Sequence, residues 1–224
     1  MIIAGVSSQS AASRAIVVPQ EESFSFAVLE SGSDKLQELQ RLRYKVYCME
    51  ESFLPAQNYP KKLEWDFYDP ISPHIAAFDG DGQIVGGLRL VRHSALGLPI
   101  ENHAGEGLSE GYRQFPKRRL AEISRLVVDR RYRQQGIAQV CGPTILLGLF
   151  RTMYETSLAL GIEHWVAAME PCLWRMLKRY GLRFEAIGKP MEFYGRVIPY
   201  GTSIKYLQRL LAQDRPDVFE LFHA

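Results

Sequence analysis

The sequence has few of the residues that build metal centres or disulfide frameworks. Its 224 residues include three cysteines and five histidines. Cys48, Cys141 and Cys172 are widely spaced and contain no C-x-x-C pair, and no two histidines stand at ligand spacing. An odd number of separated cysteines argues against a disulfide framework, and the absence of paired ligands argues against zinc. We therefore predict no metal site.

Long apolar runs and a strong net charge are also missing. No stretch approaches the ~18 apolar residues of a membrane span, and the first 20 residues lack the basic start and apolar run of a secretory signal. A net charge of +2 is too small to indicate nucleic-acid binding, and no aromatic residues interleave the basic ones in a recognisable motif. We expect a cytoplasmic protein with no integral membrane segment and no nucleic-acid partner.

What is present suffices for one substantial core, because 46% of the residues are hydrophobic. Residues 1–22 are small and polar and predict a flexible N-terminal arm, which leaves residues 23–224 as a single domain. Hydrophobic periodicity predicts strands at 24–29, 74–78, 84–91, 123–128, 163–169, 183–187 and 192–198, and helices at 36–49, 135–160, 171–179 and 203–213. Gly142-Pro143 predicts a kink or short break in the long helix. Residues 50–73 lose the period and predict a long loop.

The chain is organised around residues 121–138, AEISRLVVDRRYRQQGIA. Residues 123–128 have the β-branched content of a buried strand, and Gly136 then opens a long apolar helix. The first N–H groups of a helix lack intrahelical partners and attract anions, and Arg133 adds a charge-assisted contact. The segment is therefore predicted to bind phosphate, although an ordinary strand-to-helix turn with surface arginines is the alternative.

The spacing Arg133-x-x-Gly136-x-Ala138 resembles the phosphopantetheine-binding pattern of the GNAT superfamily of N-acyltransferases. The order of the predicted elements also matches that superfamily, which implies an α/β (α+β) fold with a mixed, mostly antiparallel central sheet and helices on both faces. The resemblance implies a phosphopantetheine thioester as cofactor, on an acyl carrier protein or as acyl-CoA. The residues expected to bind it are Leu126, Val127, Val128, Arg133, Gln134, Gln135, Gly136, Ile137 and Ala138.

Four charged motifs occur in order between residues 36 and 130: Arg43-x-x-Val46-Tyr47, Glu64-x-Asp66-x-x-Asp69, Gly86-Gly87-x-Arg89-Leu90 and Glu122-x-Ser124-Arg125. They resemble the signature of the acyl-homoserine-lactone (autoinducer) synthases. The long-chain N-acyl amino acid synthases and the acyltransferases associated with PEP-CTERM/exosortase systems share this signature. The resemblance implies a charged cluster beside the acceptor site, formed by Glu122, Arg89, Arg125, Asp66, Asp69 and Arg43.

Elementary chemistry assigns Glu122 the catalytic role in this cluster. An amine must lose a proton to attack a thioester, and a carboxylate at this position accepts it directly or through water. Backbone N–H groups around residues 126–128 are expected to hold the oxyanion. The alternative is structural, since ion pairs among these residues would also fasten the loop to the sheet, because an unpaired buried charge is costly.

The predicted function is transfer of a fatty-acyl group from a thioester to the amine of an amino-acid-like acceptor, with an acyl carrier protein as the expected partner. Three alternatives remain. They are an acyl-homoserine-lactone synthase using S-adenosylmethionine, an acetyl-CoA-dependent N-acetyltransferase, and a non-catalytic acyl-thioester sensor. The acetyltransferase is disfavoured because Leu177 stands where many acetyltransferases have a general-acid tyrosine.

Overall fold

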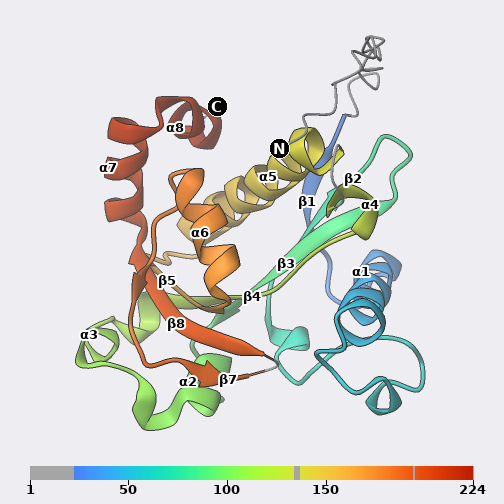
Figure 1. Ribbon diagram of the computed structural model, residues 1–224, viewed down its shortest axis with the longest axis horizontal. Coiled ribbons are helices and arrows are strands. Elements are labelled where there is room, and N and C mark those ends of the chain that lie inside the picture. Colours follow the sequence, from blue (N-terminus) through green and yellow to red (C-terminus); the bar gives the residue numbers. More distant parts are fainter. Residues whose placement is uncertain (1–22, 134–136, 194, 224) are drawn as a thin grey trace, which may run out of the picture.

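The computed structural model describes residues 23–133, 137–193 and 195–223. An eight-stranded sheet runs through it in the order β1-β2-β3-β4-β5-β8-β6, with β7 paired to β8 (Figure 1). The strands are β1 Ser25–Leu29, β2 His74–Phe78, β3 Ile84–Arg92, β4 Leu120–Val128, β5 His164–Met169, β6 Glu185–Ala186, β7 Met191–Glu192 and β8 Arg196–Ser203. Only β4 and β5 pair in parallel, and the other pairs are antiparallel. The predicted mixed, mostly antiparallel sheet is confirmed.

Helices cover both faces of the sheet. They are α1 Asp34–Tyr44, α2 Pro99–Ala104, α3 Glu110–Arg113, α4 Arg130–Arg133, α5 Ile137–Ala159, α6 Pro171–Arg179, α7 Ile204–Asp214 and α8 Pro216–His223. A π-helical turn, η1 Lys45–Glu50, extends α1, and short 3-10 turns lie at Ala56–Asn58, Asp69–Ile71, Gly105–Gly107 and Lys117–Arg119. No helix among the described residues is long and apolar enough to cross a membrane.

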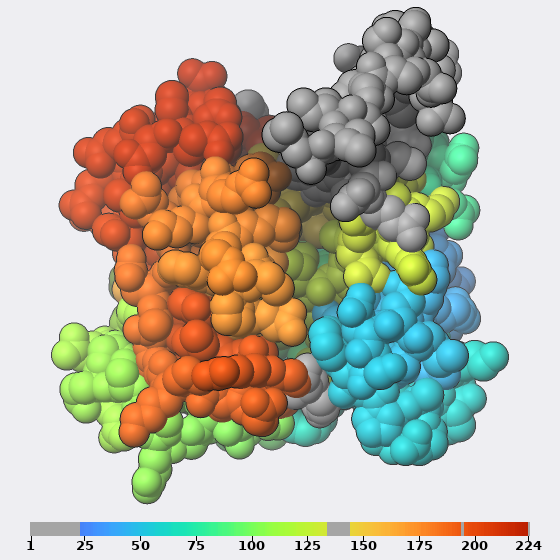
Figure 2. All heavy atoms as spheres, viewed as in Figure 1, coloured from blue at the N-terminus to red at the C-terminus, as the bar shows by residue number. Residues whose placement is uncertain are grey.

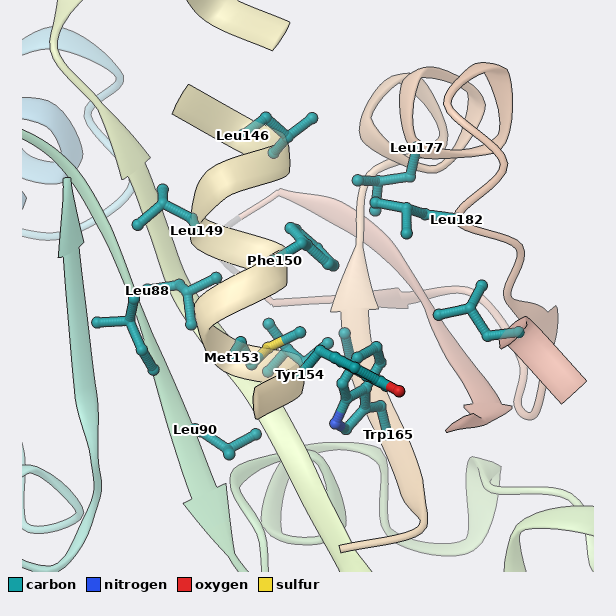
Figure 3. Close-up of a cluster of buried hydrophobic side chains, with 14 of the residues drawn as sticks. Leu88, Leu90, Leu146, Leu149, Phe150, Met153, Tyr154, Trp165, Leu177 and Leu182 are labelled. Carbon is teal, nitrogen blue, oxygen red and sulfur yellow. The ribbon is translucent and has the colours of Figure 1, made fainter. Parts of the chain in front are cut away.

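The main core lies between α5 and the centre of the sheet (Figure 3). Leu149, Phe150 and Met153 of α5 pack on Leu88 of β3 and Trp165 of β5, and all five are almost completely buried. The indole Nε1 of Trp165 donates to Ser157 Oγ at 2.9 Å, so the polar atom of this large side chain is satisfied. This packing holds α5 against β3 and β5.

Helix α1 covers the opposite face, where Leu39 and Leu42 pack against Val127. Ser33 caps the helix by accepting a hydrogen bond from the Leu36 N–H at 3.2 Å. Gly87 permits the close approach, because a Cβ there would lie 2.6 Å from Leu39 Cδ1. Helix α1 therefore lies close against β3.

The structure departs from the predicted elements in four places. Strand β4 begins at Leu120 rather than residue 123, and α5 shows no break at Gly142-Pro143 because core packing along the helix outweighs the local preference. The predicted strand 192–198 is divided between β7 and β8, since Gly195, at φ +118°, turns the chain between them. Helix α8 was not predicted. The predicted arm, residues 1–22, lies outside the described residues.

Candidate active site

The central feature of the site is the divergence of β4 from β5. The two strands pair only at Leu120–His164, Ala121–Trp165 and Glu122–Val166. Strand β4 then continues to Val128 and β5 to Met169 without further pairing in the register. The sheet therefore opens just beyond Glu122.

A β-bulge turns Arg125 out of the normal alternation of β4. The register with β3 moves from Arg89–Ser124 to Gly87–Val127, so β4 has one extra residue there. Arg125 adopts a φ of +54°, which is unusual for a residue with a side chain and costs on the order of 1–3 kcal/mol. The bulge brings the Arg125 guanidinium to the acidic loop, on the same face as Ser124.

Three arginines and three acidic residues form a buried cluster under the loop of residues 50–73. Arg43, Arg89 and Arg125 come from α1, β3 and β4, and Glu64, Asp66 and Asp69 come from the loop before β2. Every arginine contacts two of the acids. The N–O distances include Arg43–Asp69 (2.7 Å), Arg89–Asp66 (2.6 Å), Arg89–Asp69 (3.1 Å), Arg125–Glu64 (3.0 Å) and Arg125–Asp66 (2.9 Å). Arg43 also bonds Glu64. Five of the six predicted charged residues are thus brought together, with charges that balance.

The arginines determine the ionisation of the cluster. Burial acts to raise the pKa of Asp69, but the charges of Arg43 and Arg89 outweigh it and hold that pKa far below its ordinary value. The pKa of Asp66 is lowered in the same way by Arg89 and Arg125. Burial also lowers the pKa of the neighbouring His74. The lowered pKa values keep Asp66 and Asp69 ionised as carboxylates at neutral pH.

Glu122 is close to this cluster in sequence but is not paired with it. Its side chain is 2% exposed, and its Oε2 accepts a hydrogen bond from the Ile100 N–H of α2 at 2.7 Å. Among the described residues no ion pair to Glu122 is found. Burial raises the pKa of Glu122 to about 8, although Ile100, Arg89 and Arg125 act to lower it. The expectation that Glu122 would be an ion partner of Arg89 and Arg125 is wrong.

Two adjoining cavities open where the strands diverge. The first, about 260 Å³, is lined by Glu122, Arg125, Met169 and Leu177 among mainly apolar side chains. The second, about 470 Å³, is lined by Leu126, Val127, Val128 and Arg133. Both share walls formed by Tyr47, Phe53, Leu126, Glu170 and Leu173. Light-blue atoms from residues near 50 lie next to the orange atoms of the α6 region in Figure 2. Both η1 and α6 line the second cavity, through Val46, Tyr47, Leu173 and Met176.

The predicted phosphate turn is described only in part. Gln134, Gln135 and Gly136 lie outside the described residues, and Ile137 and Ala138 are described as the backbone at the start of α5. Arg133 bonds the carboxylates of Glu50 and Glu51, the latter at 2.6 Å. Its side chain is one-third exposed and lines the second cavity. Its guanidinium is paired with carboxylates of the protein.

Sequence reasoning missed three residues of the site. Glu64, 0% exposed, stands in the quoted acidic motif but was not assigned a role. Ser124 accepts a hydrogen bond from Arg89 Nε at 3.1 Å, and Tyr47 donates its hydroxyl to the Leu126 carbonyl at 2.7 Å. Both residues stand inside the quoted motifs, so the sequence marked their positions. The partners of their hydrogen bonds depend on the fold. Two aromatic residues next to the acids of the loop, Trp65 and Phe67, are exposed.

Comparisons with known proteins agree with this geometry. Residues 42–142 match the family model of the acetyltransferase (GNAT) domain. Similar solved structures include TofI in a ternary complex with an inhibitor and MTA (21% identity, TM-score 0.63, 86% of this chain and 98% of that chain). FeeM, an N-acyl amino acid synthase from uncultured soil microbes, has 17% identity and a TM-score of 0.63 over 86% of this chain and 97% of that chain.

A third similar structure is BjaI, a CoA-dependent acyl-homoserine lactone synthase solved with SAM and isopentyl-CoA. It has 22% identity and a TM-score of 0.61 over 85% of this chain and 81% of that chain. No curated protein sequence matches the chain. The predicted resemblance and fold class are confirmed, and the matched domain and shared fold identify an acyltransferase.

Proposed function

We propose that this acyltransferase moves a fatty-acyl group from a phosphopantetheine thioester to the amine of an amino-acid-like acceptor. The thioester is carried by an acyl carrier protein or by CoA. The observation that carries the proposal is a buried, unpaired Glu122 in the wall of an apolar cavity, at the point where β4 and β5 diverge. An apolar cavity suits an acyl chain, and the carboxyl group suits an amine.

The reaction requires a proton acceptor and a place for negative charge. The amine attacks the thioester carbonyl, the tetrahedral intermediate collapses, and the thiolate leaves and is protonated. A general base with a pKa near the working pH is the most effective, and the raised pKa of Glu122, about 8, meets that condition. We assign the oxyanion and pantetheine contacts to the backbone of residues 126–128, where β4 has separated from β5.

The charged cluster has a positioning role in this proposal. Its three acids lie on the loop before β2, and its arginines belong to α1, β3 and β4. The loop is thus fastened beside the first cavity, whose lining includes Arg125 of the cluster. Because Asp66 is partly exposed, 22% at its side chain, it is the acid of the cluster best placed to meet an acceptor.

The proposal that an acyl carrier protein is the donor is supported by the basic residues at one end of β4. Two groups of basic residues flank this strand and do not form one surface, because Lys117–Arg119 precede β4 and Arg130–Arg133 follow it. A nine-residue strand separates them by roughly 30 Å. Arg130 and Arg133 lie around a hollow beside the second cavity, so this end is the one at which an acidic carrier protein would deliver its pantetheine arm.

A homoserine-lactone synthase is the second candidate. The similarity to BjaI, which was solved with SAM and isopentyl-CoA, favours it. Both candidates use the same donor site and the same proton acceptor. They differ in the acceptor and therefore in whether the product is an open N-acyl amino acid or a lactone.

Mass spectrometry of lipid extracts tests the proposal and separates the two candidates. Cells expressing the wild-type protein are expected to accumulate an N-acyl amino acid, and those expressing Glu122→Gln to lose it, since one general base is worth about 10²- to 10⁴-fold in rate. Glu185→Gln, which changes an exposed glutamate on β6, is the matched control. An acyl lactone would establish the second candidate. No acylated product from a well-expressed protein would contradict both.

A further inference from the structure

Glu170 occupies a position between the two cavities that neither motif explains. It follows the last residue of β5, precedes α6, and contributes to the walls of both cavities. Glu170 occupies the N-cap position of α6, and its side chain makes no capping hydrogen bond to the helix. The side-chain contact seen is a 3.5 Å approach of Cys172 Sγ to its Oε2.

The packing around Glu170 keeps its carboxylate accessible from the cavities. Gly195, in the turn between β7 and β8, lies against it, and a Cβ at that residue would sit 3.5 Å from Glu170 Oε1. The neighbouring Phe193 lines the first cavity. The 3.5 Å separation is an ordinary van der Waals distance, so the turn at Gly195 packs beside the half-buried carboxylate.

The other acids around the cavities are not available to a cation. Glu51 is paired with Arg133, and the acids of the charged cluster are paired with three arginines. Glu122 is 2% exposed, its Oε2 accepts the Ile100 N–H, and the proposed function uses it as the proton acceptor. Within the described part of the chain, Glu170 is the carboxylate that lines both cavities and has no cationic partner.

We infer that Glu170 binds the ammonium form of the amine acceptor and holds it beside Glu122 in the first cavity. The inference rests on the proposed function, in which the acceptor is an amine. A primary amine in neutral water is an ammonium ion, and an apolar cavity admits it only with a carboxylate to pair with. Glu170 is in this sense an acceptor-binding residue, and Glu122 remains the group that takes the proton.

Calorimetry with two amphiphilic probes tests the inference without turnover. Octylammonium chloride and octanol share the same chain and differ in charge, and both are titrated below micelle formation into the full-length protein at pH 7. Wild type is expected to bind the ammonium about tenfold or more tightly than the alcohol, as one charge-assisted contact allows. Glu170→Gln is expected to abolish that preference, Glu170→Asp to retain part of it, and the control Glu192→Gln, on exposed β7, to leave it unchanged.

Acyl-transfer kinetics provide the second readout, with decanoyl-CoA as donor and a panel of amino acids and their methyl esters as acceptors. Glu170→Gln is expected to raise KM for the acceptor about tenfold and to leave KM for the thioester unchanged. Equal octylammonium affinity in wild type and Glu170→Gln, or no binding to wild type, overturns the inference whatever the activity. Absence of any N-acyl product from wild type overturns the proposed function, while calorimetry still decides whether Glu170 binds an ammonium.

Discussion

Two sets of buried acids lie beside the same sheet, and their pKa values are shifted in opposite directions. Asp69 and Glu122 are both nearly inaccessible, at 3% and 2% exposure. The pKa of Asp69 is held far below its ordinary value and that of Glu122 is raised to about 8. The difference is the partner, since Asp69 faces the guanidinium groups of Arg43 and Arg89, whereas Glu122 accepts one backbone N–H. A paired acid builds structure, and an unpaired one is poised to exchange a proton.

The comparison also separates two kinds of residue within one sequence signature. Arg43, Arg89 and the loop acids saturate one another and therefore fix the loop against α1 and β3. Buried ion pairs of this kind are weak evidence for net stability, because desolvation offsets much of their attraction. Their contribution is to specify one position for the loop. Glu122 contributes nothing to that position and is free for chemistry.

Breaking the cluster is expected to have the largest effect. Arg43→Ala leaves Glu64 and Asp69 buried without their shared cation, which is expected to lower the free energy of unfolding by about 3–5 kcal/mol. Urea unfolding followed by circular dichroism measures the change. Arg41→Ala, an exposed neighbour on α1, is the control and is expected to change stability by less than about 0.5 kcal/mol. Equal small losses in both variants would mean that the cluster is not energetically coupled to the fold.

Changing pH sharpens the comparison, since the two sets of acids respond in different ranges. Glu122 has a folded-state pKa of about 8, above the 4.5 of an ordinary glutamate, so the folded protein binds its proton more tightly. Its contribution to stability is complete below about pH 4.5 and is lost as the pH rises through 8. The lowered pKa values of Asp66 and Asp69 have the opposite sign, because their contribution is lost only as the pH falls below the ordinary aspartate value of 3.8.

Glu122→Gln is therefore expected to remove the decline in stability between pH 5 and 8. The variant should match wild type near pH 5 and be more stable above pH 8, by on the order of several kcal/mol. The measurement is the urea midpoint of both proteins at pH 5, 6, 7, 8 and 9. Parallel curves for the two proteins would show that Glu122 does not titrate in this range.

The sequence predicted the members of these two sets better than their arrangement. The four motifs predicted one cluster of Arg43, Arg89, Arg125, Asp66 and Asp69, because buried charged residues require partners. The sequence did not separate Glu122 from them, since its isolation depends on the Ile100 N–H from α2 and on the end of β4–β5 pairing. The φ of +54° at Arg125 had no signal, because a glycine would be the expected residue in that conformation.

Strands β2 and β3 and helix α6 were predicted closely, because hydrophobic period and turn residues are local signals. Contacts between distant segments were not. Arg133 bonds Glu51, 82 residues earlier in the chain, and this pairing follows from the way η1 lies over the end of β4. The predicted phosphate contact of Arg133 therefore competes with an ion pair inside the protein. Substitutions at this ion pair test the difference between paired and available charges with the smallest expected effect on stability.

Arg133 is expected to show small effects on stability and larger ones on binding. Its pairs with Glu50 and Glu51 are partly exposed, so Arg133→Gln should change the free energy of unfolding by less than about 1 kcal/mol. Loss of a charge-assisted phosphate contact should weaken CoA binding about tenfold in calorimetry at low salt. Glu51→Gln should act in the opposite direction, because it frees the guanidinium for the phosphate. If both variants weakened CoA binding equally, the ion pair itself would be part of the binding surface, and Arg133 would resemble the structural cluster rather than an available charge.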